Sequence, residues 1–156
     1  MKLSLNQTEL SMACMSGADR LLQNHKNGTS TQAKKLDRDI TGMAGEIAVA
    51  KYFNRYPDLT VGPHHNGYDL IVAGKKVEVK TTSYNPGFLQ QSTKKKITDA
   101  DIYVLVHIDL PDCEIIGGVA AQDFIHQSNI KDTGYGNMYT MESSQLRPLQ
   151  TFWRNA

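Results

Sequence analysis

The fold of this chain is decided by the stretch GYDLIVAGKKVEVK, which spans residues 67–80. A glycine followed by one further residue suits a two-residue hairpin loop of type II′, and Gly74-Lys75 is such a pair. A loop at this point predicts that strands over 69–73 and 76–82 pair antiparallel. Because paired residues share a face and side chains alternate along a strand, the pattern divides the hairpin into an apolar face and a charged face.

The expected register of this hairpin pairs Asp69 with Lys80 and Ile71 with Glu78. Asp69, Glu78 and Lys80 then lie on one face, within side-chain reach of one another. The opposite face is apolar and is formed by Leu70, Val72, Val77 and Val79. Two neighbouring carboxylates repel each other unless a proton or a cation joins them, and a hard ion such as Mg²⁺ takes oxygen ligands. An ion pair to Lys80 is the alternative that needs no metal.

Hydrophobic periodicity around the hairpin predicts a mixed α/β domain with a central sheet. The strongest buried-strand pattern is IYVLVHI at 102–108. The long polar connection over 84–100 is expected to contain a helical piece. Further helices are expected over 5–24, 41–54 and 122–127 and from residue 144 onward, and further strands over 59–61, 114–120 and 138–141.

The length of 156 residues fits a single domain over residues 1–156, with residues 1–28 as an N-terminal helical extension. With 40% apolar and 21% charged residues, the composition is typical of a soluble globular protein. No apolar run approaches the roughly 18 residues that span a bilayer, and the N-terminus has no signal-peptide pattern. Cys14 and Cys113 have no metal-ligand spacing, so we expect a reducing, cytoplasmic setting.

The charge balance, 17 Lys and Arg against 16 Asp and Glu, does not indicate bulk attraction to nucleic acid, although a local basic groove is compatible with it. The densest basic run is Lys94-Lys95-Lys96, shortly after Gln90 and Gln91. These five residues either contact a DNA backbone or form an exposed polar loop. Tyr84 and Phe88 in the same segment either stack on bases or pin the loop to the core, and pinning is favoured. No P-loop is present, which excludes an ATP-driven motor.

A carboxylate also lies within the apolar stripe of the helix expected over 41–54. Glu46 falls among apolar positions rather than opposite them, where an unpaired charge is costly. Gly42 and Gly45 remove side chains nearby, which allows the helix to approach a sheet closely. Glu46 is therefore either a further site residue or a stripe-edge residue that pairs with a lysine. His64 and His65, in the loop before the hairpin, are more consistent with surface histidines than with ligands.

These patterns together resemble the PD-(D/E)XK nuclease superfamily. The matching parts are Gly45-Glu46 on a helix, Gly67-Tyr68-Asp69 at a strand start and Glu78-Val79-Lys80-Thr81 on the next strand. The residue before Asp69 is Tyr68 rather than proline, a common departure that keeps the acidic group. The similarity is to small phage or bacterial nucleases and, more loosely, to archaeal Holliday-junction resolvases. It implies a restriction-endonuclease-like αβββαβ core with a central mixed β-sheet flanked by helices.

The resemblance also implies a site and an activity. Asp69 and Glu78 would bind Mg²⁺, for which Mn²⁺ substitutes, with the backbone carbonyl of Val79 as a further ligand and Glu46 completing the site directly or through water. Lys80 would orient the attacking water or help to deprotonate it. The expected function is a Mg²⁺-dependent nuclease that hydrolyses DNA phosphodiester bonds as an endonuclease, in the cytoplasm (of the host cell, if phage-encoded).

Two alternatives stay open: a non-catalytic member of the same fold that binds DNA or a protein, and a plain α/β domain with a solvated charged hairpin. The resemblance implies a homodimer, because cutting two strands needs two sites, and the amphipathic N-terminal helix offers a surface for it. Burial of this helix within the same subunit is the simpler alternative.

Overall fold

The computed structural model of the chain describes residues 1–26, 34–60 and 67–153. Two long helices, two β-sheets and several short helical turns make up this part of the molecule. The elements are β1 (Lys2–Ser4), α1 (Gln7–Lys26), α2 (Lys34–Tyr52), β2 (Leu70–Val72), β3 (Lys75–Thr82), β4 (Phe88–Ser92), β5 (Ile102–Asp109), β6 (Asp112–Ala120), α3 (Ala121–Phe124), η1 (Gln127–Asn129), β7 (Ile130–Asp132), β8 (Asn137–Glu142), η2 (Ser143–Gln145) and η3 (Leu149–Phe152).

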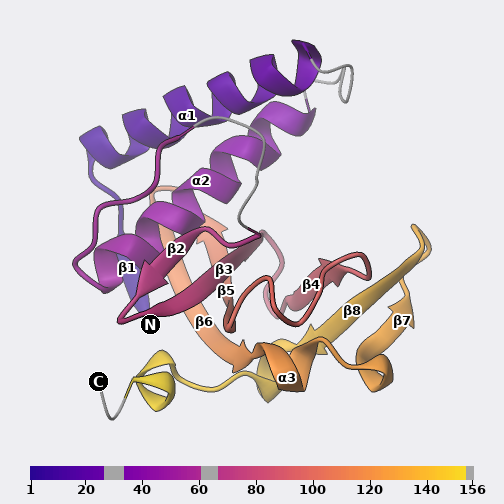
Figure 1. The fold of residues 1–156 in the computed structure, drawn as a ribbon. Helices are drawn as coiled ribbons and strands as arrows, with labels where there is room; N and C mark the ends of the chain where they lie inside the picture. The colour runs from indigo at the N-terminus through magenta and orange to yellow at the C-terminus, as the bar shows by residue number, and fades with distance from the viewer. Residues whose placement is uncertain (27–33, 61–66, 154–156) are drawn as a thin grey trace.

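The main sheet has five strands in the order β1-β6-β5-β3-β2. β3 and β5 are parallel, whereas the other neighbours are antiparallel, so the sheet is mixed. α1 and α2 lie together over one face of this sheet, as Figure 1 shows. This arrangement confirms the expectation of an α/β fold with a central mixed sheet flanked by helices.

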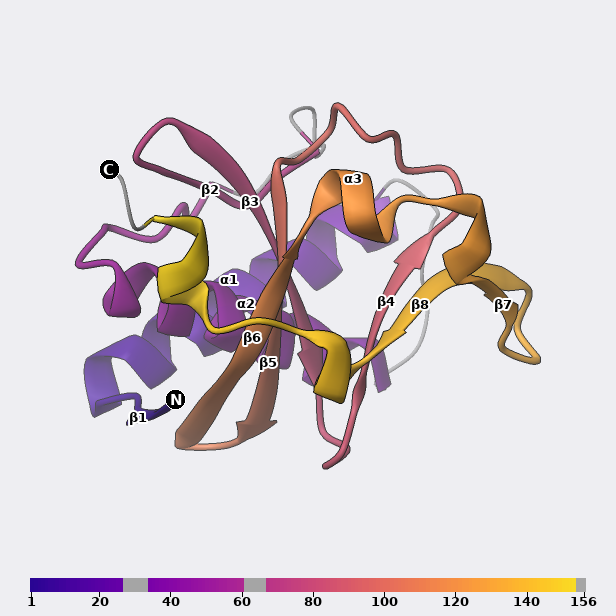
Figure 2. The same cartoon turned by 90° about the horizontal axis from the view of Figure 1, so that it is seen from below.

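A second, three-stranded antiparallel sheet has the order β4-β8-β7. Figure 2 shows it running alongside the main sheet, with α3 near it and α1 and α2 behind. Tyr103 and Leu105 of β5 pack against Leu89 of β4, Phe124 of α3 and Met141 of β8 in one buried cluster. The main sheet is therefore covered on both faces, and β4 lies close to β3 at the point where the charged residues of the hairpin emerge.

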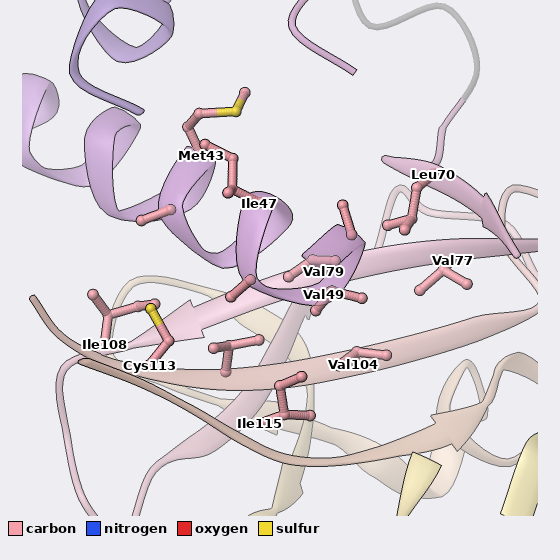
Figure 3. Close-up of a cluster of buried hydrophobic side chains, with 14 of the residues drawn as sticks. Met43, Ile47, Val49, Leu70, Val77, Val79, Val104, Ile108, Cys113 and Ile115 are labelled. Carbon is pink, nitrogen blue, oxygen red and sulfur yellow. The ribbon is translucent and has the colours of Figure 1, made fainter. Parts of the chain in front are cut away.

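The larger core fills the space between α2 and the main sheet (Figure 3). Val77 and Val79 of β3 and Val104 of β5 meet Met43 and Ile47 of α2 there. The apolar face expected for the hairpin is confirmed, because all four of its residues belong to this core: Leu70, Val72, Val77 and Val79.

Sequence features fix both the start of α1 and its contact with α2. At the start of α1, Asn6 and Glu9 each accept a hydrogen bond from the other's backbone N–H, which is a capping box. In the middle of α1, Gly17 lets α2 approach so closely that a Cβ atom there would lie 2.7 Å from the Ile40 side chain. No helix in the described ranges is long and apolar enough to cross a membrane.

The hairpin register differs from the expected one by two residues. Leu70 pairs with Val77 and Val72 with Lys75, so the loop is Ala73-Gly74 and not Gly74-Lys75. Both loop residues have positive φ, +47° and +79°, as a type I′ turn requires. A shift of two residues keeps every side chain on its face, and it moves Asp69 next to Glu78 rather than Lys80.

A contact outside the hairpin also holds the start of β3. Asp101, just before β5, accepts a hydrogen bond from the Lys76 backbone N–H through its Oδ2 (2.7 Å), and its own N–H donates to the Lys76 carbonyl (2.8 Å). The clamp fixes Lys76 as a strand residue two positions from Gly74. The hairpin sequence alone contains no trace of it.

Several element predictions were wrong. α2 begins at Lys34, well before residue 41, because its first turns pack through Ile40 against α1. The connection over 84–100 contains β4 and no helix, since β4 pairs with β8. Residues 59 and 60 are not in a strand, and Val61 lies outside the described residues. After α2 and the following connection, five strands succeed one another from β2 to β6.

Candidate functional site

One cavity of about 420 Å³ brings together the acidic and basic residues singled out in the sequence. It lies where α2, the β2–β3 hairpin and the segment after β4 meet. Its lining includes all five residues expected to form a site, which are Glu46, Asp69, Glu78, Val79 and Lys80. Arg20, Arg38, Asp39 and Lys95 add further charge, so that four carboxylates face four cations.

Asp69 is fixed at the entrance of β2 by the hairpin itself. Its N–H donates to the Val77 carbonyl (2.9 Å), and its Oδ2 accepts a hydrogen bond from the Val79 N–H (2.7 Å). Burial, together with the negative charges of Glu46 and Glu78, raises the pKa of Asp69 to about 7. The Val79 hydrogen bond and Lys80 act in the opposite direction without compensating. Asp69 is thus a buried carboxylate that lies within electrostatic reach of two other carboxylates, Glu46 and Glu78.

Glu78, in the middle of β3, is only 5% exposed and is fully hydrogen-bonded. Its Oε1 accepts from Lys80 Nζ (2.7 Å) and Gln91 Nε2 (3.1 Å), and its Oε2 accepts from Lys95 Nζ (3.1 Å). Lys80 reaches it because residues two apart on a strand share a face. The ion pair expected as the alternative to a metal is therefore present, together with two donors from the segment around β4.

Glu46 approaches the cavity from α2 and is held by an arginine that the sequence analysis missed. Arg20 of α1 binds it in a bidentate ion pair, with Nη1–Oε1 at 2.8 Å and Nη2–Oε2 at 2.9 Å. Burial by itself would lower the pKa of Arg20, but the hydrogen bonds and charge of Glu46 raise it above its usual value. A signal for Arg20 did exist, since it lies at helical spacing from the buried Ala13 and Ser16 on the same face of α1.

The five residues considered as DNA contacts separate into two groups. Gln91 is buried against Glu78, and Lys95 binds both Glu78 and the Gly67 carbonyl (2.6 Å), so both belong to the cavity rather than to an outer surface. Gln90, Lys94 and Lys96 are exposed. Alternation along β4 separates Gln90 from Gln91, and a turn after β4 directs Lys95 alone into the site. His64 and His65 lie outside the described residues.

Two residues that line the cavity each have a buried polar atom without a hydrogen-bond partner, namely Arg20 Nε and Asp39 Oδ2. Buried polar atoms normally find partners, so these two are exceptions. The lining is also rich in carboxylate oxygen, which is the ligand type that Mg²⁺ selects. The residues present therefore fit a hard divalent cation by the chemistry of their oxygen atoms.

The carboxylates are nevertheless not arranged as a ready-made metal cage. Among the described residues, no three Asp, Glu, His or Cys side chains are grouped as metal ligands. Glu46 is engaged by Arg20, and Glu78 by Lys80 and Lys95. Binding of a cation by all three carboxylates thus requires some of these cations to release their partners.

No family model matches the sequence, and comparisons with curated proteins and with solved structures return no match. Function has to be argued from the cavity itself.

Proposed function

We propose that this protein is a Mg²⁺-dependent nuclease that hydrolyses DNA phosphodiester bonds as an endonuclease. The observation that carries the proposal is the convergence of Asp69, Glu78 and Lys80 with Glu46 in one cavity, where Asp69 is left with a pKa of about 7. A buried carboxylate held beside two further carboxylates is suited to a divalent cation, because the cation offsets their mutual repulsion. In phosphodiester hydrolysis, such a cation activates a water molecule, and the cation and a nearby ammonium together stabilise the negative charge that develops on the phosphate.

The cation would be held by Asp69 and Glu78, with the Val79 carbonyl and Glu46 as further oxygen ligands. When bound, Mg²⁺ (or Mn²⁺) lowers the pKa of a coordinated water and neutralises charge on the phosphate. The backbone N–H of Val79 keeps Asp69 oriented toward this position. Gln91 Nε2 holds Glu78 in place through its Oε1.

Lys80 is the residue proposed to act on the reacting atoms. Its side chain is 30% exposed, so it reaches both Glu78 and the open part of the cavity. There the ammonium would orient the attacking water and support the negative charge that builds up on the phosphate. Glu78 holds the ammonium at this place through the ion pair of 2.7 Å.

We also propose that α2, the β2–β3 hairpin and β5 form a restriction-endonuclease-like core. The support is the parallel β3–β5 pair, with the Asp, the Glu-x-Lys set and the helical Glu at the positions that the resemblance implies. β4 would then be an insertion between the two parallel strands, where the expected helix is replaced by a strand of the second sheet.

One observation favours a second candidate, a non-catalytic protein of the same fold that binds DNA or another protein. Every oxygen of Glu46 and Glu78 already accepts a hydrogen bond from a protein donor. If these ion pairs were too stable to exchange, the cavity would keep its shape and bind no metal.

A cleavage assay separates the two candidates. The substrates are supercoiled plasmid, linear duplex, branched DNA and single-stranded DNA, each with and without Mg²⁺. We expect Mg²⁺-dependent cutting that is lost in Asp69→Asn and Glu78→Gln and strongly slowed in Lys80→Ala. The exposed Asp109 and Lys131 provide matched controls, and Asp109→Asn and Lys131→Ala should cut at the unmodified rate. Unaltered cutting by folded Glu78→Gln protein would refute the site, and absence of cutting by the unmodified protein would favour the non-catalytic candidate.

The cytoplasm, of a host cell if the protein is phage-encoded, is the compartment we propose. Cys14 and Cys113 are both free thiols, and burial raises the pKa of Cys113 to about 11, which keeps it in the unreactive thiol form.

A further inference from the structure

A second hollow of about 430 Å³ adjoins the carboxylate cavity. The two share part of their lining, namely Arg38, Lys80 and Thr81. Lys80 therefore has one side toward the proposed reaction site and the other toward this second hollow. A strand of nucleic acid that places a phosphate beside Lys80 would continue into it.

Two aromatic side chains line this hollow while remaining largely exposed. Tyr84 is 76% exposed and Phe88 is 51% exposed. The interpretation that these rings pin the loop to the core is thus wrong, because neither is buried. Large apolar groups that stay in water beside a functional cavity are a common mark of a binding surface.

The backbone holds both rings outward. Burial alternates along β4, so that Phe88 and Gln90 face out while Leu89 and Gln91 face in. Before β4, the Tyr84 N–H donates to Thr82 Oγ1 (3.1 Å). Gly87 packs so tightly in this turn that a Cβ would lie 2.6 Å from Thr82 Cγ2. The rings are thus presented by a braced turn and a paired strand.

The chemistry of the lining suits one nucleotide. Aromatic faces stack on bases of any sequence, and Gln90 offers an amide for a base edge. Arg38 and Lys80 supply positive charge for the adjoining phosphates, opposed by one carboxylate, Asp37. Within a duplex the base faces are already stacked, so only an unpaired base can use this surface fully.

We infer that the hollow between Tyr84, Phe88 and Lys80 is a subsite for an unpaired base next to the cleaved phosphate, which makes single-stranded or flapped DNA the preferred substrate. This inference rests on the proposed nuclease function, since it places the subsite relative to the reaction site. It adds a substrate class that the carboxylate cavity alone does not specify.

Binding without catalysis tests the subsite. The probes are a fluorescein-labelled single-stranded oligodeoxynucleotide and the same sequence as a blunt duplex, followed by anisotropy in EDTA. We expect Tyr84→Ala with Phe88→Ala to weaken single-strand binding by about 5-fold to 150-fold, the range of losing one stacked base, and to leave duplex binding nearly unchanged. Tyr84→Phe and Phe88→Trp keep a ring and should bind single strands like the unmodified protein. Tyr135, which is 99% exposed at the far β7–β8 turn, provides the control Tyr135→Ala.

The outcomes separate the subsite from the nuclease proposal. Equal weakening of single-strand and duplex binding, or no weakening in a variant shown to be folded by circular dichroism, overturns the subsite. If the ring-dependent preference for single strands is present but Mg²⁺ induces no cutting, the subsite holds and the nuclease function fails. If cutting occurs and the preference does not depend on the rings, the nuclease holds and the subsite fails.

Discussion

The protonation of Asp69 links the site to the stability of the folded chain. Its pKa of about 7 lies well above the ordinary carboxyl value of about 3.9. The folded protein therefore binds the Asp69 proton more tightly than the unfolded chain does. Between about pH 4 and pH 7 the free energy of unfolding must fall as pH rises, and above pH 7 the full penalty of the buried charge is present.

Asp69→Asn removes this titration while keeping the shape of the side chain. We expect the variant to be about 1–3 kcal/mol more stable than the unmodified protein near pH 8 and nearly equal to it near pH 4. Urea unfolding across this pH range measures the difference. Asp109→Asn is the control, because that carboxylate is exposed. Parallel pH curves for the unmodified protein and Asp69→Asn would show that Asp69 keeps an ordinary pKa.

Much of the site could be predicted residue by residue, because side-chain parity survives an error in register. Asp69, Glu78 and Lys80 share a face in both the expected and the observed pairing. The partners that hold them could not be predicted this way. Gln91 and Lys95 reach Glu78 only because β4 folds back beside β3, which is a long-range event absent from the local pattern.

At the scale of elements, the packing of α2 on the main sheet is set by its glycines. A Cβ on Gly45 would lie 2.3 Å from Thr81 Cγ2, whereas a Cβ on Gly42 would meet nothing within 4 Å. The two glycines are one helical turn apart, so they share backbone preference and differ in surroundings. They offer a matched pair of substitutions.

We expect Gly45→Ala to destabilise the protein by about 1–2 kcal/mol, since overpacking outweighs the gain in helix propensity. Gly42→Ala should instead stabilise it by about 0.5–1 kcal/mol. Chemical unfolding of both variants measures this. Thr81→Ser removes the obstructing methyl group, so the double variant Gly45→Ala with Thr81→Ser should recover most of the loss. A Gly45→Ala protein as stable as Gly42→Ala would mean that α2 does not approach β3 so closely.

Strands and helices whose own sequence has a clear hydrophobic pattern were predicted from the sequence. Those whose secondary structure depends on contact with a distant element were not. β5 was expected over 102–108 and is observed as Ile102–Asp109, because an apolar, β-branched run between turn signals has few alternatives. β4, by contrast, has a polar sequence whose strand character comes from pairing with β8. The early start of α2 likewise follows from contact with α1, which periodicity within α2 does not reveal.

At the scale of the whole molecule, α1 lies outside the proposed nuclease core and yet completes its site through Arg20. The expectation of a homodimer rested on the amphipathic face of α1. Ala13 and Gly17 on that face are buried, and Gly17 lies directly against Ile40 of α2 in the same chain. The structure thus removes this support, and a dimer stays a prediction without it.

The cavity lies between the helical layer, the main sheet and the segment after β4, so a cation bound there should stabilise the whole fold. A ligand at about 100 times its Kd adds about 2.7 kcal/mol, which corresponds to a rise in Tm of roughly 5–10 °C for a chain of this size. Asp69 must lose its proton to bind the cation, and it is ionised above about pH 7. We therefore expect Mg²⁺ to raise Tm near pH 8 and to have much less effect near pH 5.

Thermal unfolding in MgCl₂, compared with NaCl at equal ionic strength, separates cation binding from general screening. Glu78→Gln should abolish the Mg²⁺ shift, and Asp109→Asn should keep it. The size of the Mg²⁺-induced rise in Tm also depends on the strength of the ion pairs in the metal-free site. Arg20 and Lys95 must release their carboxylate partners before the cation can bind them. A shift of the same size in Glu78→Gln, or one that is independent of pH, would place the bound cation outside this cavity.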